Sequence, residues 1–188
     1  LVNLVEHLTS GAELRHSYKN LYGITVIDDK YAKGYEFASD PMVWQPTDVV
    51  NYRVMPIEIS RGCKFKCKFC SFPMNGKKTV DYVKHSDLLH QELVNNYKKF
   101  GVQTYCIIDE TFNDDIGKLL SIRDVVRQLD FKPIFWCFAR LDLICIHPEM
   151  LEMLYDIGVR AMYFGIETFD SRAGRNVGKG YKSNKQID

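Results

Sequence analysis

The stretch Val54-Met-Pro-Ile-Glu-Ile-Ser-Arg-Gly-Cys-Lys-Phe-Lys-Cys-Lys-Phe-Cys70 leads from a short apolar run into a loop with three cysteines. The apolar run, residues 54–60, predicts a β-strand. Cys63, Cys67 and Cys70 follow with the spacing C-x3-C-x2-C. Cysteines spaced this closely favour a metal-binding loop. The alternative, a disulfide framework, is typical of short secreted proteins. We therefore predict a ligand loop at the end of a strand.

The other cysteines, Cys106, Cys137 and Cys145, stand singly among apolar neighbours. A free cysteine behaves as a small hydrophobic side chain and is often buried. This predicts core positions for Cys106 and Cys137, while Cys145 follows a predicted strand and has no assigned role.

The three-cysteine loop is compatible with two kinds of metal site. Structural zinc needs four ligands, and neither a second cysteine pair nor a paired-histidine motif follows; His85 and His90 are the nearest histidines. Three thiolates suit a [4Fe-4S] cluster in which one iron has no protein ligand, so that a substrate or cofactor can bind there. Lys64, Lys66 and Lys68 either offset the negative charge of such a cluster or are ordinary surface lysines.

Downstream of the loop, amphipathic helices alternate with apolar strands. Helices are predicted over residues 87–100, with Ser86 as N-cap, and over residues 114–129 and 148–157. Strands are predicted over residues 102–109, 134–140 and 160–168. This order predicts an α/β protein with a parallel sheet covered by helices. The aromatic run at residues 135–138 is interpreted as core of this sheet rather than as a substrate platform.

Ligands of parallel α/β sheets bind beyond the carboxyl ends of the strands. In this chain that edge holds the cysteine loop and the polar residues Asp109, Glu110, Arg140, Asp142, Glu167 and Thr168. We expect these residues to lie close together.

Composition and charge exclude several other classes of protein. The 188 residues include 25 Lys plus Arg against 24 Asp plus Glu, which gives a net charge of +1, and 46% are hydrophobic. These values disfavour disorder and general binding to nucleic acid. No apolar run approaches the ~20 residues of a membrane-spanning helix, and residues 1–10 do not resemble a signal peptide. We expect a cytoplasmic protein without a membrane partner.

The sequence predicts two parts, a leader and a main domain. Residues 1–53 are predicted to form a leader or connector with a β-rich run over 21–27, and residues 54–188 the main domain. The chain begins with Leu, and its polar stretch from residue 178 to residue 188 carries no cap signal. These features predict a piece of a longer protein.

The cysteine loop, with Phe69 directly before its last cysteine, resembles the signature of the radical S-adenosylmethionine (radical SAM) superfamily. The resemblance extends over residues 55–179 and includes Arg61-Gly62, Asp109-Glu-Thr-Phe112, Gly165-Ile-Glu-Thr168 and Lys179. It implies a partial (β/α) barrel of TIM type. The family commonly has six βα units, of which four are visible here, so the resemblance also implies that this chain alone lacks part of the site.

The resemblance implies which residues bind the cofactors. Cys63, Cys67 and Cys70 would bind a [4Fe-4S] cluster, and S-adenosylmethionine would chelate the fourth iron. Phe69 would lie near the adenine.

Weaker matches concern the remainder of S-adenosylmethionine. The segment Asp109-Glu110-Thr111 would bind the methionine amino group, although it lacks the family's usual glycine pair, and which carboxylate binds stays open. Glu167 would meet the ribose and Arg140 the cofactor carboxylate. The alternative for Arg140 is a local ion pair with Asp142.

The reaction implied is reductive cleavage of S-adenosylmethionine to methionine and a 5′-deoxyadenosyl radical, which abstracts hydrogen from a substrate. Such a protein would be oxygen-sensitive and would need an electron donor such as flavodoxin or ferredoxin. The substrate is unknown, since methyl transfer, methylthiolation, ring formation and rearrangement all use this chemistry. Residues 1–53 are similar to the connector after a cobalamin-binding domain, so cobalamin is a possible further cofactor.

Two alternatives remain. One is a structural iron-sulfur or zinc binding module without catalysis, and the other is a catalytically silent family member acting as a scaffold. The intact Asp109 and Glu110 argue against the second.

Overall fold

The computed structural model describes residues 17–19, 25–27, 37–49, 54–72, 76–78 and 82–179. The chain divides into two compact units, residues 1–36 and 37–188. In the first unit, β1 (Ser17–Lys19) pairs antiparallel with β2 (Thr25–Ile27), which lies within the predicted β-rich run. The predicted polar end of the chain lies outside the described residues from residue 180 onward.

The second unit is built on a four-stranded parallel sheet. Its strands are β3 (Met55–Ile57), β4 (Thr104–Ile107), β5 (Ile134–Ala139) and β6 (Val159–Phe164), and they lie in the order β3-β4-β5-β6. Each strand pairs in parallel with the next along the chain. The predicted α/β partial barrel is therefore confirmed.

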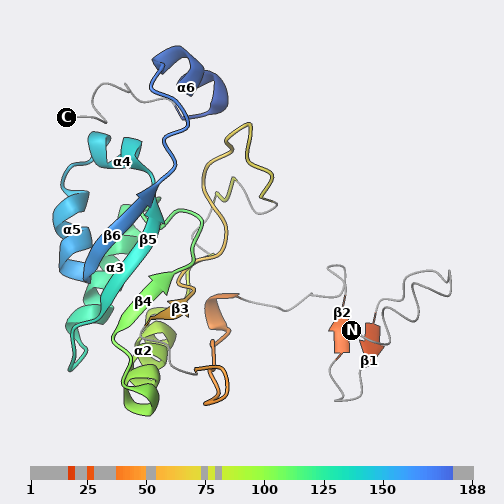
Figure 1. Ribbon diagram of the computed structural model, residues 1–188, viewed down its shortest axis with the longest axis vertical. Coiled ribbons are helices and arrows are strands. Elements are labelled where there is room, and N and C mark those ends of the chain that lie inside the picture. Colours follow the sequence, from red (N-terminus) through yellow and green to blue (C-terminus); the bar gives the residue numbers. More distant parts are fainter. Residues whose placement is uncertain are drawn as a thin grey trace. The chain divides into compact units, whose positions relative to one another are not determined.

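Helices connect consecutive strands and lie along one face of the sheet (Figure 1). They are α2 (Ser86–Phe100), α3 (Ile116–Arg127) and α5 (Met150–Ile157). Two short helices, α4 (Leu141–Ile146) and α6 (Ser171–Val177), and the 3-10 turn η1 (Phe37–Ser39) were not predicted. Helices of two turns or fewer are too short to show a clear apolar stripe. None of the helices described here is long and apolar enough to cross a membrane.

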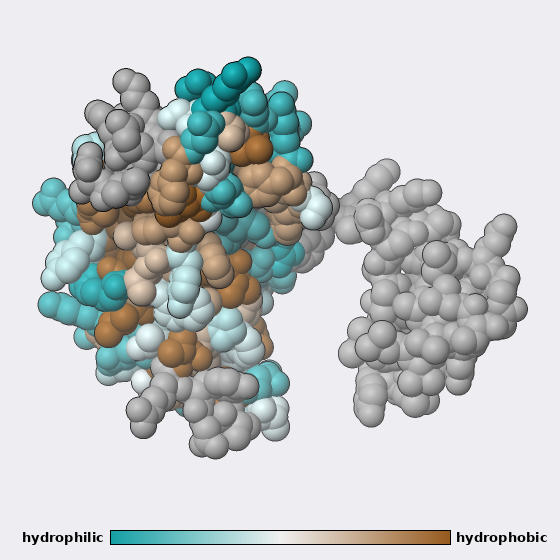
Figure 2. Space-filling model, turned by 45° about the horizontal axis from the view of Figure 1, so that its top comes forward, coloured by the Kyte–Doolittle hydropathy of each residue, from teal (hydrophilic) through white to brown (hydrophobic). Residues whose placement is uncertain are grey.

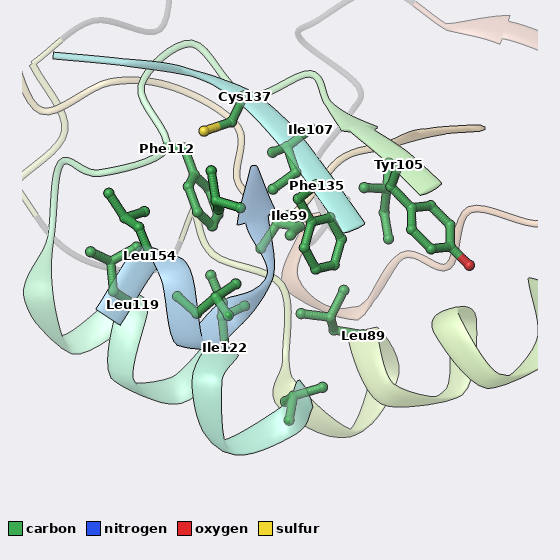
Figure 3. Close-up of a cluster of buried hydrophobic side chains, with 14 of the residues drawn as sticks. Ile59, Leu89, Tyr105, Ile107, Phe112, Leu119, Ile122, Phe135, Cys137 and Leu154 are labelled. Atoms are coloured by element: carbon green, nitrogen blue, oxygen red, sulfur yellow. The ribbon is translucent and has the colours of Figure 1, made fainter. Parts of the chain in front are cut away.

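The two faces of the sheet differ sharply in burial. On the helix side, strand residues pack against the helices in one core (Figure 3) that includes Ile59, Leu89, Tyr105, Ile107, Phe112, Leu119, Ile122, Phe135, Cys137 and Leu154. On the opposite face, Phe138 is 47% and Tyr163 is 56% exposed. Because side chains alternate along a strand, only half of the aromatic run belongs to the core, and the expectation for Phe138 is corrected. Cys137 is buried as predicted, whereas Cys106 is half-buried.

Helix ends follow the sequence signals with one difference. Gly101 and Gly158 end α2 and α5 in the left-handed conformation, with φ of 66° and 104°. The N-cap of α2 is His85 rather than Ser86. Ser86 is instead the first helical residue, and its hydroxyl lies 2.8 Å from that of Ser121 on α3.

Residues 37–49 belong to the second unit, so the predicted boundary at residue 53 falls inside it. The Ala38 carbonyl accepts a hydrogen bond from the His85 backbone N–H at 2.9 Å. The Glu92 carboxylate accepts from the Met42 backbone N–H at 2.6 Å and from Lys84 Nζ at 2.8 Å. Lys84 and Glu92 are both buried. The hydrogen bond between Met42 and Glu92 joins residues 50 positions apart in the sequence, so no local pattern indicated it.

Candidate functional site

A cavity of about 230 Å³ lies where the cysteine loop meets the carboxyl ends of the strands. Its lining comes from the loop, from the segment after β4, from the ends of β5 and β6 and the residues directly after them, and from Lys179, two residues beyond α6. The residues are Cys63, Phe65, Cys67, Phe69, Cys70, Phe72, Glu110, Thr111, Phe138, Ala139, Arg140, Tyr163, Gly165 and Lys179. A larger cavity of about 350 Å³ lies between residues 41–44 and α2 and contains none of these residues.

None of the three loop cysteines forms a disulfide bond within the described residues. Cys63 is buried, Cys67 is half-buried and Cys70 is exposed. The Cys63 carbonyl accepts hydrogen bonds from the backbone N–H groups of Gly76 at 2.7 Å and Lys77 at 3.0 Å, which closes the loop on itself. The loop therefore brings three sulfur atoms to one cavity.

In the part of the chain that the structure describes, no three His, Cys, Asp or Glu side chains surround a point where a single metal ion would sit. His85 and His90 do not line the cavity. The cysteines of an iron-sulfur cluster each bind a different iron and so surround a larger body than one ion. Three cysteine side chains lining one cavity fit that donor set.

The neighbouring carboxylates Asp109 and Glu110 point in opposite directions. Asp109 is 1% exposed; it accepts hydrogen bonds from the Ile59 backbone N–H at 2.9 Å and from Ser60 Oγ at 2.6 Å. Burial raises the pKa of Asp109 to about 6, against the opposing effects of Lys118 and of these hydrogen bonds. Glu110 lines the cavity and accepts from the Gly62 backbone N–H at 3.0 Å. The structure thus brings Glu110, not Asp109, to the site.

A buried ionic network around Lys118 contacts the cavity residue Thr111. Lys118 Nζ lies 2.6 Å from Asp114 Oδ1, and both side chains are fully buried. Lys118 also donates to Ser60 Oγ at 3.2 Å and to the Thr111 carbonyl at 3.1 Å. The Thr111 hydroxyl in turn lies 3.3 Å from Cys63 Sγ. Lys118 was not predicted as a site residue, because its position on α3 resembles that of an ordinary surface lysine.

Arg140 follows β5 and reaches back to the cysteine loop. Its Nη1 lies 3.3 Å from Cys67 Sγ, and its guanidinium carbon lies 3.9 Å from the centroid of the Phe65 ring. Both Nε and Nη2 donate to the Asp142 carboxylate. Burial acts to lower the pKa of Arg140, but the hydrogen bonds and charges of Asp142 and Cys67 raise it overall, so the guanidinium stays charged. The alternative ion pair is present, and Arg140 also lines the cavity.

The segment after β6 contacts the loop from another side. Glu167 adopts a left-handed backbone conformation with φ of 64° and is exposed, outside the cavity lining. Lys179 Nζ donates to Glu167 Oε1 at 2.9 Å and to the Gly165 carbonyl, and it lies 5.5 Å from the centroid of the Phe69 ring. Lys179 is a cavity residue that was noted in the sequence only as part of a motif.

The sequence of this chain is similar to those of known proteins. Residues 57–188 match the model of the radical SAM superfamily. An uncharacterised methyltransferase of Pyrococcus horikoshii is 26% identical over 154 residues, which cover 79% of this chain and 31% of that protein.

Solved structures show a similar fold. The cobalamin-dependent S-adenosylmethionine radical enzyme OxsB, with aqua-cobalamin and S-adenosylmethionine bound, matches with a TM-score of 0.67 and 19% identity. Its apo form matches with a TM-score of 0.63. The match covers 99% of this chain and 29% of OxsB. The chain therefore spans about a third or less of the length of these proteins.

Proposed function

Because this chain belongs to the radical SAM superfamily, we propose that it forms the part of a radical SAM enzyme that holds a [4Fe-4S] cluster and S-adenosylmethionine. The observation that carries the proposal is the cavity at the strand ends, where three cysteine side chains meet Glu110 and Arg140. A structural zinc or iron-sulfur module would not require a carboxylate and a guanidinium beside the thiols.

In this proposal Cys63, Cys67 and Cys70 bind three irons and leave the fourth for S-adenosylmethionine. A bound, reduced cluster would supply the electron needed for reductive cleavage of a carbon–sulfur bond of S-adenosylmethionine. The protein's part is to bind, orient and shield these groups.

The cavity residues divide this work by their chemistry. The Glu110 carboxylate can accept a hydrogen bond from the methionine amino group, and Phe69 offers a ring beside the cluster loop for the adenine. Asp109 acts indirectly, since it ties the backbone of Ile59 and the hydroxyl of Ser60 to the end of β4. Glu167 acts through Lys179.

Relatives favour one class of net reaction for the whole protein. OxsB is a cobalamin-dependent radical enzyme and the Pyrococcus protein is named a methyltransferase. We therefore include cobalamin, bound outside this radical SAM unit, and methyl transfer in the proposal, without assigning a substrate. The proposal also includes a flavodoxin or ferredoxin as electron donor. We propose further that the enzyme is cytoplasmic and sensitive to oxygen.

The test is electron paramagnetic resonance of the chain after anaerobic reconstitution with iron and sulfide and reduction with dithionite. We expect the signal of a reduced [4Fe-4S] cluster, and a change in its shape when S-adenosylmethionine is added. Separate Cys63→Ser, Cys67→Ser and Cys70→Ser variants should lose the signal and most of the bound iron. Cys106→Ser is the matched control, because Cys106 is a half-buried cysteine outside the cavity.

Two results would contradict the proposal. Stoichiometric zinc with no cluster would favour a structural zinc module. A cluster whose signal does not change when S-adenosylmethionine is added would favour a structural iron-sulfur module.

A further inference from the structure

The Arg140 guanidinium is held in one orientation from several sides. Asp142 accepts from Nε at 2.9 Å and also from Nη2, which makes a two-point ion pair. The ring of Phe65 lies against the guanidinium at 3.9 Å. The Arg140 backbone is fixed as well, because its N–H donates to Asn113 Oδ1 at 2.8 Å and its carbonyl accepts from Asn113 Nδ2 at 3.0 Å.

This orientation leaves Nη1 facing the cysteine loop, 3.3 Å from Cys67 Sγ. The Arg140 side chain is only 8% exposed, so water competes little for this contact. When a carboxylate fixes one edge of a planar guanidinium, an N–H on another edge can point at a second acceptor. The Arg140–Asp142 pair is therefore built to present a hydrogen-bond donor to the Cys67 sulfur.

We propose that Arg140 raises the reduction potential of the cluster by donating a hydrogen bond to the Cys67 sulfur. This inference rests on the proposed function, because it takes Cys67 as a cluster ligand. Hydrogen bonds to the ligand sulfurs and the local charge are among the factors that set the potential of iron-sulfur clusters. Reduction adds negative charge to the cluster and its thiolates, and a buried N–H donor stabilises that charge. Arg140 is thus a positioning residue for the electron transfer step.

The role differs from the one implied by the family resemblance, in which Arg140 meets the carboxylate of S-adenosylmethionine. An arginine that only bound the cofactor would leave the potential unchanged while the cofactor is absent. The measurement is therefore a redox titration followed by electron paramagnetic resonance, made on the reconstituted chain without S-adenosylmethionine.

The variant is the double substitution Arg140→Met with Asp142→Asn. It removes the donor while the net charge stays the same and no buried carboxylate is left unpaired. The matched control is Arg127→Met with Asp156→Asn, which removes the same charges from an exposed pair with an N···O distance of 3.4 Å. We expect a lower midpoint potential in the Arg140 double variant and the parent value in the control. Arg140→Lys, which keeps the charge without the planar fork, should fall between them.

Each other result has a defined meaning. An unchanged potential in the Arg140 double variant overturns this inference and leaves the proposed function standing. Loss of the cluster from both Arg140 variants, with circular dichroism spectra like the parent's, also overturns it, because Arg140 would then serve assembly. Absence of a cluster in the unmodified chain would overturn the proposed function as well.

Discussion

Asp109 and Glu110 are adjacent carboxylates with opposite surroundings. Asp109 lies on the core side of the β4 end and holds the Ile59 backbone N–H and the Ser60 hydroxyl, whereas Glu110 lines the cavity. Consecutive residues in extended backbone point to opposite sides. One residue is therefore available to a cofactor, and its neighbour maintains the position of the strand that precedes the cysteine loop.

The stability of the chain should depend on the ionisation of Asp109. Its folded-state pKa of about 6 is above the ordinary value of 3.8, because burial disfavours the charged form. Its contribution to stability is therefore complete below about pH 4 and is lost as the pH rises through 6. Asp109→Asn never ionises, so from pH 4 to pH 7 it should gain about 2 kcal/mol in unfolding free energy relative to the parent.

Urea unfolding at pH 4, 5, 6 and 7 measures this difference. Asp124→Asn is the control, because the Asp124 side chain is 65% exposed on α3. Parallel pH profiles for the parent and Asp109→Asn would show that the Asp109 carboxyl titrates as it does in the unfolded chain.

At the scale of elements, two glycines end α2 and α5 in the same left-handed conformation but in different surroundings. A Cβ on Gly101 would meet nothing within 4 Å, whereas a Cβ on Gly158 would lie 2.3 Å from the Pro133 carbonyl oxygen. Gly158 is the point at which the chain turns from α5 into β6. The space around each glycine, not only its φ, therefore decides what the turn tolerates.

Alanine substitutions should separate these two effects. Gly101→Ala should cost about 1 kcal/mol in unfolding free energy, since only the left-handed conformation is penalised. Gly158→Ala should cost clearly more, because the Pro133 backbone, just before β5, must also move away from the added Cβ. Urea midpoints of the two variants give the comparison. Equal losses would mean that the backbone around Pro133 yields without cost.

At the scale of the whole molecule, the helices that the structure describes in the second unit cover one face of its sheet (Figure 1). On the other face Ile108, Phe138 and Tyr163 are 44%, 47% and 56% exposed. The Phe138 and Tyr163 ring centroids lie 5.6 Å apart, so these side chains form a continuous apolar surface. Figure 2 shows one side of the molecule, where apolar residues gather between polar ones.

This uncovered face should bind a hydrophobic dye. We expect the double substitution Phe138→Ser with Tyr163→Ser to reduce the fluorescence of bound anilinonaphthalene sulfonate, because exposed apolar patches of folded proteins bind such probes. The unfolding free energy should fall by only about 1 kcal/mol per residue, since each ring is already half exposed. Tyr155→Ser is the control: Tyr155 is 65% exposed but lies on α5. Dye binding that stays the same in the double variant would place the dye elsewhere.

The amino-acid pattern alone was enough to predict the order of strands and helices, the parallel sheet, and the edge at which the cysteine loop lies. These features depend on local signals: apolar strands, amphipathic helices, and glycines such as Gly101 and Gly158 that end helices. Those signals act between residues near one another in the chain, so they can be read without coordinates. The short helices α4 and α6 were not predicted, because a helix of two turns or fewer shows too little periodicity in its apolar residues.

Which side chains meet at that edge depends on the packing of the folded chain. The contact of Arg140 with Cys67 joins residues 73 positions apart, and that of Lys118 with Ser60 joins residues 58 positions apart. This packing also turned Asp109 into the core and left Phe138 open to the cavity. Such contacts follow from how whole elements pack, because burial and hydrogen bonding between distant segments have no period in the sequence.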